Sequence, residues 1–429
     1  MTTSLPLSID QARELDRNNP LAGFRKRFYL PNEKIYMDGN SLGLLSVDAE
    51  QSLLRVLDEW KNLGIDGWLQ GERPWFWFAE EIGAMAATLV GARPEEVVLT
   101  GTTTVNIHAL VSSFYEPNGR RTKILADELN FPSDLYALQG QLRLRGFDPD
   151  HHLVLAISTS DGLLEEQDII DLMTADIALV FLPSVLYRSG QLLDMQRLTA
   201  AARERNIPIG FDCSHSVGAV PHYFNDWGVD FALWCSYKYL NGGPGCAAFL
   251  YTNQKHFAKD PLLAGWFGCD KNKQFDMLNT FVPANNAGRW QISSPGILGT
   301  SPIEGAMKIM LEAGIENIRR QSLRLTDYLI ALIREKILGK FAGFRFATPL
   351  QAGRRGGHIA VEHPEAMRIC QALKVRGIIP DLRPPSIIRF APVALYNTFE
   401  EVFCLVEALA EIMESREYEE FTSQRKAIS

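Results

Sequence analysis

The chain carries the stretch Trp234-Cys235-Ser236-Tyr237-Lys238-Tyr239-Leu240-Asn241-Gly242-Gly243-Pro244-Gly245, in which a lysine stands between aromatic residues and a glycine-rich turn. The stretch follows a strand-like segment, and Asp212 follows another such segment upstream. Surroundings that exclude water lower the pKa of an ammonium group and make the amine a usable nucleophile. The alternative is a solvated loop lysine and an aspartate that caps a helix. The apolar, aromatic composition around Lys238 favours a buried nucleophile.

A Schiff-base lysine together with an acidic group is the pairing that pyridoxal 5'-phosphate needs. The cofactor forms its covalent link with the amine, and the carboxylate balances the positive charge of its pyridine nitrogen. Lys238 and Asp212 therefore predict a pyridoxal-phosphate site.

Short apolar runs alternate with helical patterns between residues 97 and 250, which is typical of parallel strands joined by crossover helices. In such open sheets, ligands bind outside the carboxyl ends of the strands. Asp212 and Lys238 both stand at that edge. The strand-like runs cover residues 96–100, 122–125, 153–156, 177–182, 208–211 and 231–235.

The C-terminal third predicts a smaller α+β unit. An amphipathic pattern from Pro302 to Leu332 predicts one long helix that bridges two domains. We expect an N-terminal segment (1–60) that packs with the small domain, a large domain (61–301) and a small domain (302–429). Further strands are expected over 344–347, 358–361 and 387–390, and helices over 366–375 and 398–413.

Composition narrows the functional classes. The chain has 429 residues, a net charge of −8 and 46% hydrophobic residues, which predicts a large buried core and disfavours binding to nucleic acid or to an anionic membrane. The six cysteines show no Cys-x-x-Cys spacing, so we expect reduced thiols and no metal site. No leader-like or membrane-spanning apolar stretch is evident, so a cytoplasmic location is expected.

Other segments supply candidate ligand contacts. The run Gly101-Thr102-Thr103-Thr104 follows a strand and opens a helix, so its amides and hydroxyls can hold a phosphate, although an ordinary threonine cap is the alternative. Phe131 and Asp134 offer a stacking ring and a polar contact, or simply a helix start. His215 can orient Asp212 by hydrogen bonding, or be an ordinary core histidine.

A second group of candidates concerns the substrate. Arg389, within an apolar strand, matches a substrate carboxylate, or else an internal salt bridge, and the sequence favours neither. Trp68 and Trp266 lie in glycine-flanked segments and line either an apolar pocket or an interface.

Taken together, these segments resemble the kynureninase family over nearly the full length. The motifs are Tyr36-Met37-Asp38-Gly39-Asn40-Ser41-Leu42-Gly43, Phe131-Pro132-Ser133-Asp134, Asp212 with His215, Ser236-Tyr237-Lys238-Tyr239-Leu240-Asn241, Gly265-Trp266-Phe267-Gly268 and Arg389-Phe390-Ala391-Pro392. The resemblance implies a fold-type I pyridoxal-phosphate enzyme. Such an enzyme is α/β, with a large domain built on a mostly parallel seven-stranded sheet and a smaller α+β C-terminal domain.

The resemblance also implies a role for each candidate. Lys238 forms the Schiff base, Asp212 pairs with the pyridine nitrogen, and Tyr237 is both a phosphate contact and a proton donor. The remaining cofactor contacts are Thr103, Thr104, Phe131, Asp134 and His215, with Trp266 and Ser294 entering from the second subunit of a homodimer. Arg389 binds the substrate carboxylate, and Trp68, Asn40 and Ser41 complete the substrate site.

Two positions bear on how closely the chain follows the family pattern. Pro183 stands where relatives tend to carry a hydroxyl residue that touches the cofactor, and Ser184 is a possible substitute. Trp68 favours kynurenine over 3-hydroxykynurenine, because an indole offers less to an extra hydroxyl than a histidine does.

The function implied is hydrolysis of the Cβ–Cγ bond of L-kynurenine to anthranilate and L-alanine, in tryptophan degradation and NAD biosynthesis. A cysteine desulfurase or lyase of the same fold is one alternative, but it needs a mobile cysteine, and Cys370 and Cys404 lie in helical apolar patterns. An aminotransferase is another. A noncatalytic interaction protein is the third, which the presence of Lys238, Asp212 and Arg389 disfavours.

Overall fold

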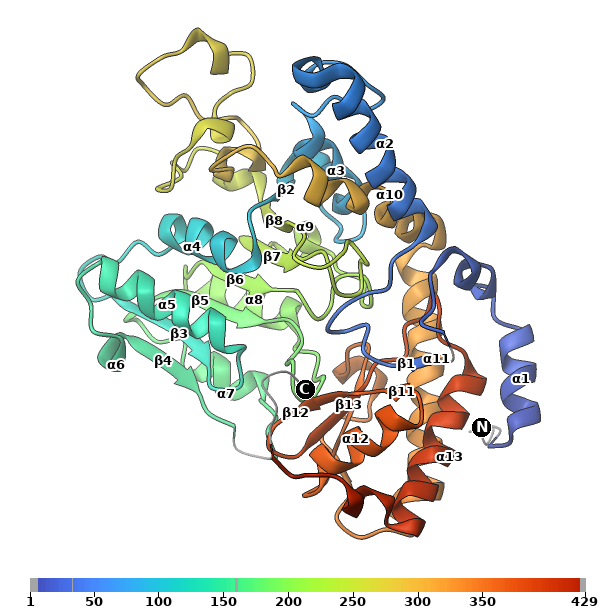
Figure 1. Cartoon of the computed structure of the whole chain (residues 1–429). Helices are drawn as coiled ribbons and strands as arrows, with labels where there is room; N and C mark the ends of the chain where they lie inside the picture. Colours follow the sequence, from blue (N-terminus) through green and yellow to red (C-terminus); the bar gives the residue numbers. More distant parts are fainter. Residues whose placement is uncertain (1–6, 33, 159–160, 425–429) are drawn as a thin grey trace.

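A seven-stranded sheet forms the centre of the computed structural model, which describes residues 7–32, 34–158 and 161–424 (Figure 1). The strand order is β2-β8-β7-β6-β5-β3-β4. Strands β7, β6, β5, β3 and β4 run parallel, and β8 is antiparallel to both of its neighbours. The strands are β2 (Val97–Thr100), β3 (Lys123–Asp127), β4 (Leu153–Ala156), β5 (Ile177–Pro183), β6 (Ile209–Asp212), β7 (Phe231–Cys235) and β8 (Ala248–Thr252).

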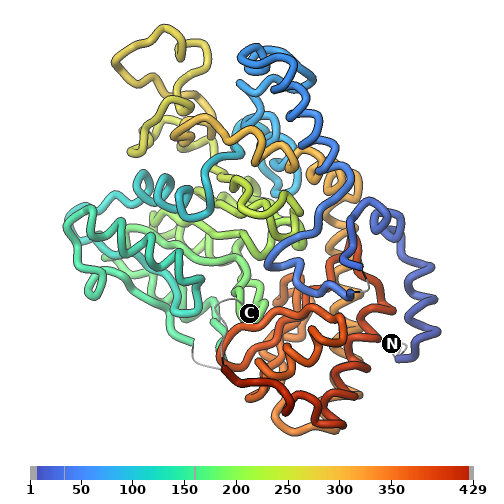
Figure 2. Tube along the Cα trace, viewed as in Figure 1, coloured from blue at the N-terminus to red at the C-terminus, as the bar shows by residue number. Residues whose placement is uncertain are grey.

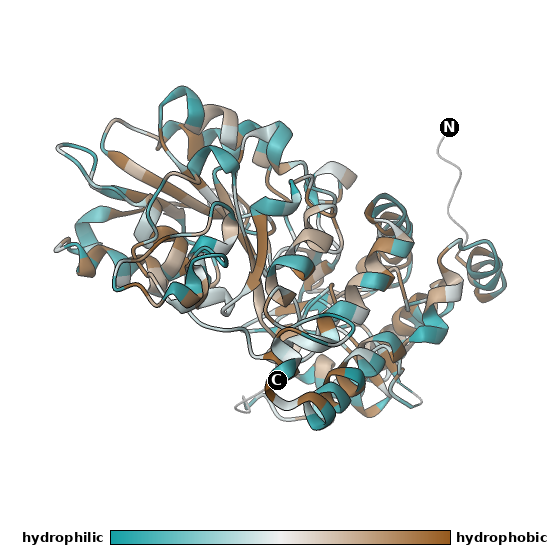
Figure 3. Ribbon diagram, turned by 90° about the horizontal axis from the view of Figure 1, so that it is seen from above, coloured by the Kyte–Doolittle hydropathy of each residue, from teal (hydrophilic) through white to brown (hydrophobic). Residues whose placement is uncertain are grey.

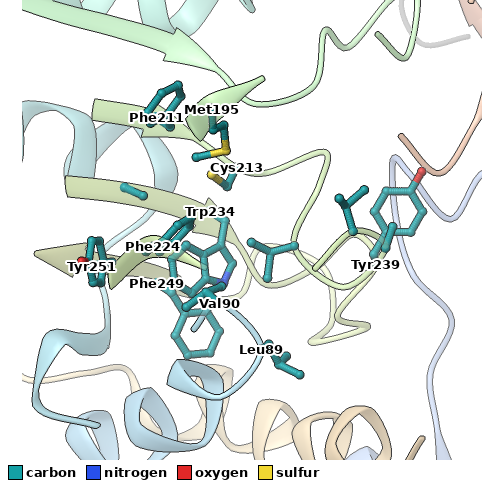
Figure 4. Packing of buried hydrophobic residues seen from close by; sticks show 14 of the residues in the cluster. Leu89, Val90, Met195, Phe211, Cys213, Phe224, Trp234, Tyr239, Phe249 and Tyr251 are labelled. Carbon is teal, nitrogen blue, oxygen red and sulfur yellow. The ribbon is translucent and has the colours of Figure 1, made fainter. Parts of the chain in front are cut away.

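Helices cover both faces of this sheet, because its strands are buried on both sides and need apolar partners on each. On one face, α4 (Thr103–Phe114) and α5 (Pro132–Leu144) pack against the strands. On the other, α3 (Phe78–Ala87), α7 (Glu166–Asp171), α8 (Met195–Glu204) and α9 (Phe224–Trp227) enclose the larger core. Figure 4 shows that core around Trp234, and Figure 3 shows apolar strands behind helices with hydrophilic outer faces.

The C-terminal part forms a second hydrophobic core around a four-stranded antiparallel sheet of order β12-β13-β10-β9. Its strands are β9 (Arg345–Phe346), β10 (Ile359–Glu362), β12 (Asp381–Arg383) and β13 (Ile387–Phe390). Its helices are α11 (Ile315–Ile333), α12 (Ala366–Val375) and α13 (Phe399–Ser415). The predicted strands and helices of this region are therefore present, and β12 was not predicted.

The N-terminal residues pack onto this second unit, and Figure 2 shows the blue start of the chain beside its red end. Helix α1 (Ile9–Arg17) lies against α13, and strand β1 (Ile35–Tyr36) pairs in parallel with β11 (Ile378–Ile379). The division of the chain at residues 60 and 301 stays a prediction.

Shorter helical segments complete the described chain. Among the described residues, no helix has the length and apolar character needed to span a membrane. The segments are α6 (Pro149–His152), η1 (Ala22–Arg27), η2 (Gly64–Trp68), η3 (Pro94–Glu96), η4 (Gln254–His256), η5 (Trp266–Gly268), η6 (Gln274–Asp276), η7 (Ala287–Trp290), η8 (Arg334–Leu338), η9 (Ala352–Arg354) and η10 (Glu417–Glu420).

The single long helix expected from Pro302 to Leu332 is wrong, because two helices occupy this region. Helix α10 (Ile297–Ala313) ends at Gly314, whose φ of +75° suits glycine and breaks the helical path before α11 begins. The amphipathic pattern continues across the break because both helices bury one face. The period of the pattern therefore did not reveal the boundary, although the glycine marks it.

Helix α10 packs closely against α2 (Val47–Leu63), and Gly305 makes this approach possible. A Cβ atom at Gly305 would lie 2.1 Å from the backbone oxygen of Asp48, a contact that requires backbone movement. On the same helix, a Cβ atom at Gly299 would meet no atom within 4 Å.

We therefore expect Gly305→Ala to lower the free energy of unfolding by about 2–3 kcal/mol through overpacking. Gly299→Ala is the matched control, and it should leave stability unchanged or raise it by up to about 1 kcal/mol, since alanine is the better helix former. Urea unfolding of both variants measures the difference. Equal stabilities would contradict the close contact between α2 and α10.

Candidate active site

Lys238 lies in the turn that follows β7, at the carboxyl edge of the sheet. The turn is held by hydrogen bonds from the Gly242 amide to the Ser236 carbonyl (2.8 Å) and from the Asn241 amide to the Lys238 carbonyl (3.0 Å). The Lys238 side chain is half-buried, and its Nζ lies 2.9 Å from Nε2 of His215. The amine is thus fixed at its tip by a second turn of the chain.

That second turn follows β6, the parallel neighbour of β7, and carries Asp212 and His215. The Ser214 amide donates to the Asp212 carboxylate over 2.7 Å. Burial, with the nearby charge of Lys238, holds the pKa of His215 well below its ordinary value. A neutral imidazole can accept a hydrogen bond from Lys238 Nζ. His215 therefore contacts the lysine, and the Ser214 amide is what holds Asp212, instead of the expected His215 bond.

A second carboxyl group, that of Asp134, lies fully buried in the first turn of α5. Burial and the neighbouring charge of Asp212 raise the pKa of Asp134 well above its ordinary value, so Asp134 keeps a proton that it can share with Asp212. At the end of β3, burial raises the pKa of Asp127 to about 7. Asp134, which lies beside Asp212 and near Lys238, thus stays neutral.

Phe131 caps α5, and its ring is 42% exposed although the helix that it starts is packed on the sheet. Tyr187 meets it edge to face, with ring centroids 5.2 Å apart. An accessible aromatic face on the residue whose carbonyl accepts from the Asp134 amide is a suitable surface for stacking a flat heterocycle.

The first turn of α4 offers a site for an anion. Thr102 caps this helix without a hydrogen bond from its side chain, so the first amides are not satisfied by it, and Thr103 and Thr104 are half-buried there. Gly101, with a φ of +56°, turns the chain from β2 into the helix. Free amides at the positive end of a helix dipole bind phosphate groups.

Arg389 is fully buried on β13, and the structure shows the salt bridge that the sequence left open. Its guanidinium contacts the Asp381 carboxylate, donates to the Tyr187 carbonyl, and lies 3.0 Å from Ser41 Oγ. Arg383 also donates to Asp381 (2.9 Å) and to Ser41 (3.2 Å). Two arginines therefore share one aspartate and one serine hydroxyl.

The segment that contains Asn40 and Ser41 runs along the lysine turn. The Gly43 amide donates to the Tyr237 carbonyl over 2.7 Å, and a Cβ at Gly43 would clash with the Lys238 carbonyl. Asn40 is fully buried, and neither polar atom of its side chain has a hydrogen-bond partner among the described residues. A buried amide without a partner is a group that a ligand can satisfy.

Trp266 and Ser294 are both exposed, and no contact in the described chain connects them with Lys238. Trp266 is 42% exposed and meets Phe275 edge to face. Trp68 is half-buried between Trp75 and Phe267, each with its ring centroid 5.9 Å away. The single chain thus brings His215, Asp212 and Asp134 together near Lys238 and leaves Trp266 and Ser294 on its surface.

Sequence reasoning missed three polar residues at this site, namely the buried Asp381 and His358 and the half-buried Arg383. The His358 ring lies 6.2 Å from that of His215, and burial beside Arg389 and Arg383 lowers its pKa well below the ordinary value. A charged residue at each end of the short strand Asp381–Arg383 was the available signal. Nothing in the sequence placed that strand beside β13.

The buried carboxyl of Asp127 makes stability depend on pH. The folded state releases this proton near pH 7 and the unfolded chain near pH 3.8, so this group's contribution to stability falls as pH rises between these values. An asparagine at this position does not ionise, so Asp127→Asn should not lose stability as pH rises. We expect its free energy of unfolding at pH 8 to be about 1–3 kcal/mol higher than that of the original chain. Chemical denaturation from pH 4.5 to 8 measures the difference.

The exposed Asp58 provides the control, since Asp58→Asn should leave the pH dependence unchanged. An Asp127→Asn difference that does not vary with pH would contradict the burial of an acid at this position.

Comparisons with known proteins place this geometry in context. The family model for the kynureninase C-terminal domain matches residues 318–409. A cysteine desulfurase from Thermococcus onnurineus shares the fold with a TM-score of 0.75 and 19% sequence identity, and the match covers 92% of this chain and 98% of that chain. A C-DES mutant with glycine covalently linked to its PLP cofactor shares it with a TM-score of 0.76 and 17% identity, and the match covers 90% of this chain and 99% of that chain. The mostly parallel sheet and the C-terminal unit are therefore confirmed as the expected fold-type I architecture.

Sequence relatives match along the whole chain. The kynureninase of Geobacillus thermodenitrificans is 56% identical over 428 residues and covers 100% of both chains. Those of Bacillus thuringiensis and Shouchella clausii are each 55% identical, with 98% of both chains covered. Identity of this degree over the full length shows that the chain belongs to the kynureninase family.

Proposed function

We propose that the chain is a pyridoxal-phosphate-dependent hydrolase that cleaves L-kynurenine, with water, into anthranilate and L-alanine. The full-length identity to proteins named kynureninase carries this proposal. The Lys238 contact with His215, beside Asp212 and Asp134, supports it at the level of residues.

The residues present fit the cofactor. The first turn of α4 suits the phosphate, because the Thr102 side chain makes no capping hydrogen bond there and Thr103 and Thr104 supply hydroxyl groups. The exposed face of Phe131 suits the pyridine ring. Asp212 would lie against the pyridine nitrogen, with Asp134 behind it. When bound, pyridoxal phosphate supplies a carbonyl carbon to an amine and a ring that withdraws electrons from the bonds at the substrate Cα.

Lys238 and His215 control the proton at one atom, the lysine Nζ. A neutral His215 accepts a hydrogen bond from Nζ, which orients the amine in its turn. Lys238 would be the base that takes the substrate α-proton. Burial raises the pKa of Tyr237, so this phenol keeps its proton at neutral pH and can donate it to the three-carbon product after the Cβ–Cγ bond breaks.

Arg389 would bind the substrate carboxylate on the side where its Nη2 meets Ser41. The ion pair with Asp381 orients the guanidinium, and Arg383 supplies a second positive charge to the same place. Asn40, buried without a partner among the described residues, would donate to or accept from the substrate. Trp68 would face the aromatic ring and favour kynurenine over its 3-hydroxy form.

The proposal includes a homodimer in which Trp266 and Ser294 complete the site of the other copy. The segment that carries η5 and η6 projects away from the large sheet, as Figure 1 shows, and it exposes large apolar side chains. Unpaired apolar surface of this kind marks association sites. The exposed side chains are Leu262, Leu263, Trp266, Phe275, Met277 and Leu278, with Leu54, Leu57 and Trp60 on α2.

The free cysteines support a cytoplasmic location, and the burial of four of them disfavours these four as the reactive cysteine of a desulfurase. All are free thiols, as expected in a reducing compartment. Burial raises the pKa of Cys213, Cys235 and Cys370, and raises that of Cys246 to about 11, so these thiols are poor nucleophiles. An aminotransferase is distinguished by its need for a keto-acid acceptor.

Lys238→Ala should lower turnover of L-kynurenine at least a thousandfold, because it removes both the cofactor link and the base. Anthranilate fluorescence and alanine release, in equal amounts, measure the reaction. Lys374→Ala, at another half-buried lysine, should keep the original rate. Full turnover by Lys238→Ala would contradict the proposed function.

A mixture of two inactive variants tests the shared site. Lys238→Ala and Trp266→Ala damage different components, so a dimer with one copy of each contains one intact site if Trp266 serves the other copy. Co-refolded in equal amounts, the two should recover about a quarter of the original activity, as random pairing predicts. No recovery, with dimers present, would mean that Trp266 acts within its own chain, and a Trp266→Ala variant that is active by itself would mean that Trp266 does not serve the site.

A further inference from the structure

A chain of hydrogen bonds lies directly behind the turn that carries Asp212. The Ser184 amide and hydroxyl both donate to the Asp212 backbone carbonyl, over 2.8 Å and 3.2 Å. The Ser184 and Ser216 hydroxyl oxygens are 2.6 Å apart, and His222 Nε2 lies 2.8 Å from Ser216 Oγ. The chain thus connects the end of β5, the turn after β6 and the segment before α9.

The protons of these groups can all be placed in one direction. Burial lowers the pKa of His222 to about 3, so the ring is neutral and carries one proton. With that proton on Nε2, His222 donates to Ser216, Ser216 donates to Ser184, and Ser184 donates to the Asp212 carbonyl. Each donor then has an acceptor, as buried polar groups require. Ser216 also lies 3.1 Å from the Cys213 carbonyl, a second acceptor on the same turn.

All three side chains are buried, with Ser184 and Ser216 fully inaccessible and His222 2% exposed. His222 packs against Phe224 and Trp227, with ring centroids 5.2 Å and 6.1 Å away. The lysine-facing groups of the same turn, Asp212 and His215, make none of these side-chain contacts. The hydrogen-bond chain therefore holds the turn from its rear, on the side of the larger core.

We infer that Ser184, Ser216 and His222 are positioning residues that set the place of Asp212, and with it the affinity for pyridoxal phosphate. The inference rests on the proposed role of Asp212 as the partner of the pyridine nitrogen. The Ser214 amide, which belongs to the same turn, donates to the carboxylate, so the position of the backbone decides where the carboxylate points. The same bonds engage the Ser184 hydroxyl, which therefore does not replace the hydroxyl missing at Pro183.

The inference is tested by titrating the apoprotein with pyridoxal phosphate and following the visible band of the bound cofactor against pH. Ser216→Ala breaks the chain at its centre, and His222→Phe removes its first donor. We expect each to weaken cofactor binding about three- to tenfold, the effect of one or two lost hydrogen bonds, and to shift the pH at which the band titrates. His222→Gln keeps a donor near Nε2 and should bind the cofactor within about twofold of the original chain.

Ser301→Ala is the matched control, because Ser301 is equally buried and its hydroxyl bonds only to the Leu298 carbonyl of its own helix. It should leave both readouts unchanged. Thermal unfolding of each apoprotein shows whether stability has changed. If Ser216→Ala does not fold, the comparison of His222→Phe with His222→Gln decides.

The inference would be overturned if Ser216→Ala and His222→Phe bound the cofactor as tightly as the original chain and showed the same pH titration of the visible band. That result would leave the proposed function standing. Equal losses in Ser301→Ala would overturn the inference too, since any buried change would then have this effect. An original chain that binds no pyridoxal phosphate would contradict the proposed function as well, and so the two failures are distinguishable.

Discussion

The contact between Lys238 Nζ and His215 Nε2 depends on the parallel pairing of β6 and β7. Parallel neighbours end at the same edge of the sheet, so the turns after them meet, and each carries one of the two side chains. Most of the other parts of the site are located relative to this edge. Helix α4 begins there after β2, α5 begins there after β3, and the N-terminal segment bonds to the lysine turn through Gly43.

Burial of charge is the second constraint on this site. A fully buried Arg389 is tolerated because Asp381 neutralises it and because Ser41 and the Tyr187 carbonyl accept hydrogen bonds from its guanidinium. Asp134 is tolerated beside Asp212 because it stays protonated. Burial, together with the nearby positive groups, lowers the pKa of His215 and of His358 well below the ordinary value, so both rings stay neutral. The charges of the site are therefore compensated largely within the protein itself.

The parts of the fold that could be predicted from sequence were those with a local signal. Strand runs and the residues directly after them placed Asp212 and Lys238 at one edge, and the structure agrees. The antiparallel strand β8 was missed because its apolar run was not separated from the glycine turn before it. The break at Gly314 was missed because the apolar period continues through it. Asp381 and Arg383 needed the pairing of β12 with β13, which no local pattern encodes. Trp266 and Ser294 are exposed on the single chain, so their role in the site of a second copy stays a prediction.

The most direct measurement is to find which lysine holds the cofactor. The protein loaded with pyridoxal phosphate is reduced with borohydride, digested, and its peptides are mapped by mass. The structure predicts a stable pyridoxyl group on Lys238, in the peptide that contains Ser236 to Asn241, because this is the lysine held against His215 beside Asp212 and Asp134. A label on another lysine, or no label on Lys238, would contradict the account of this site.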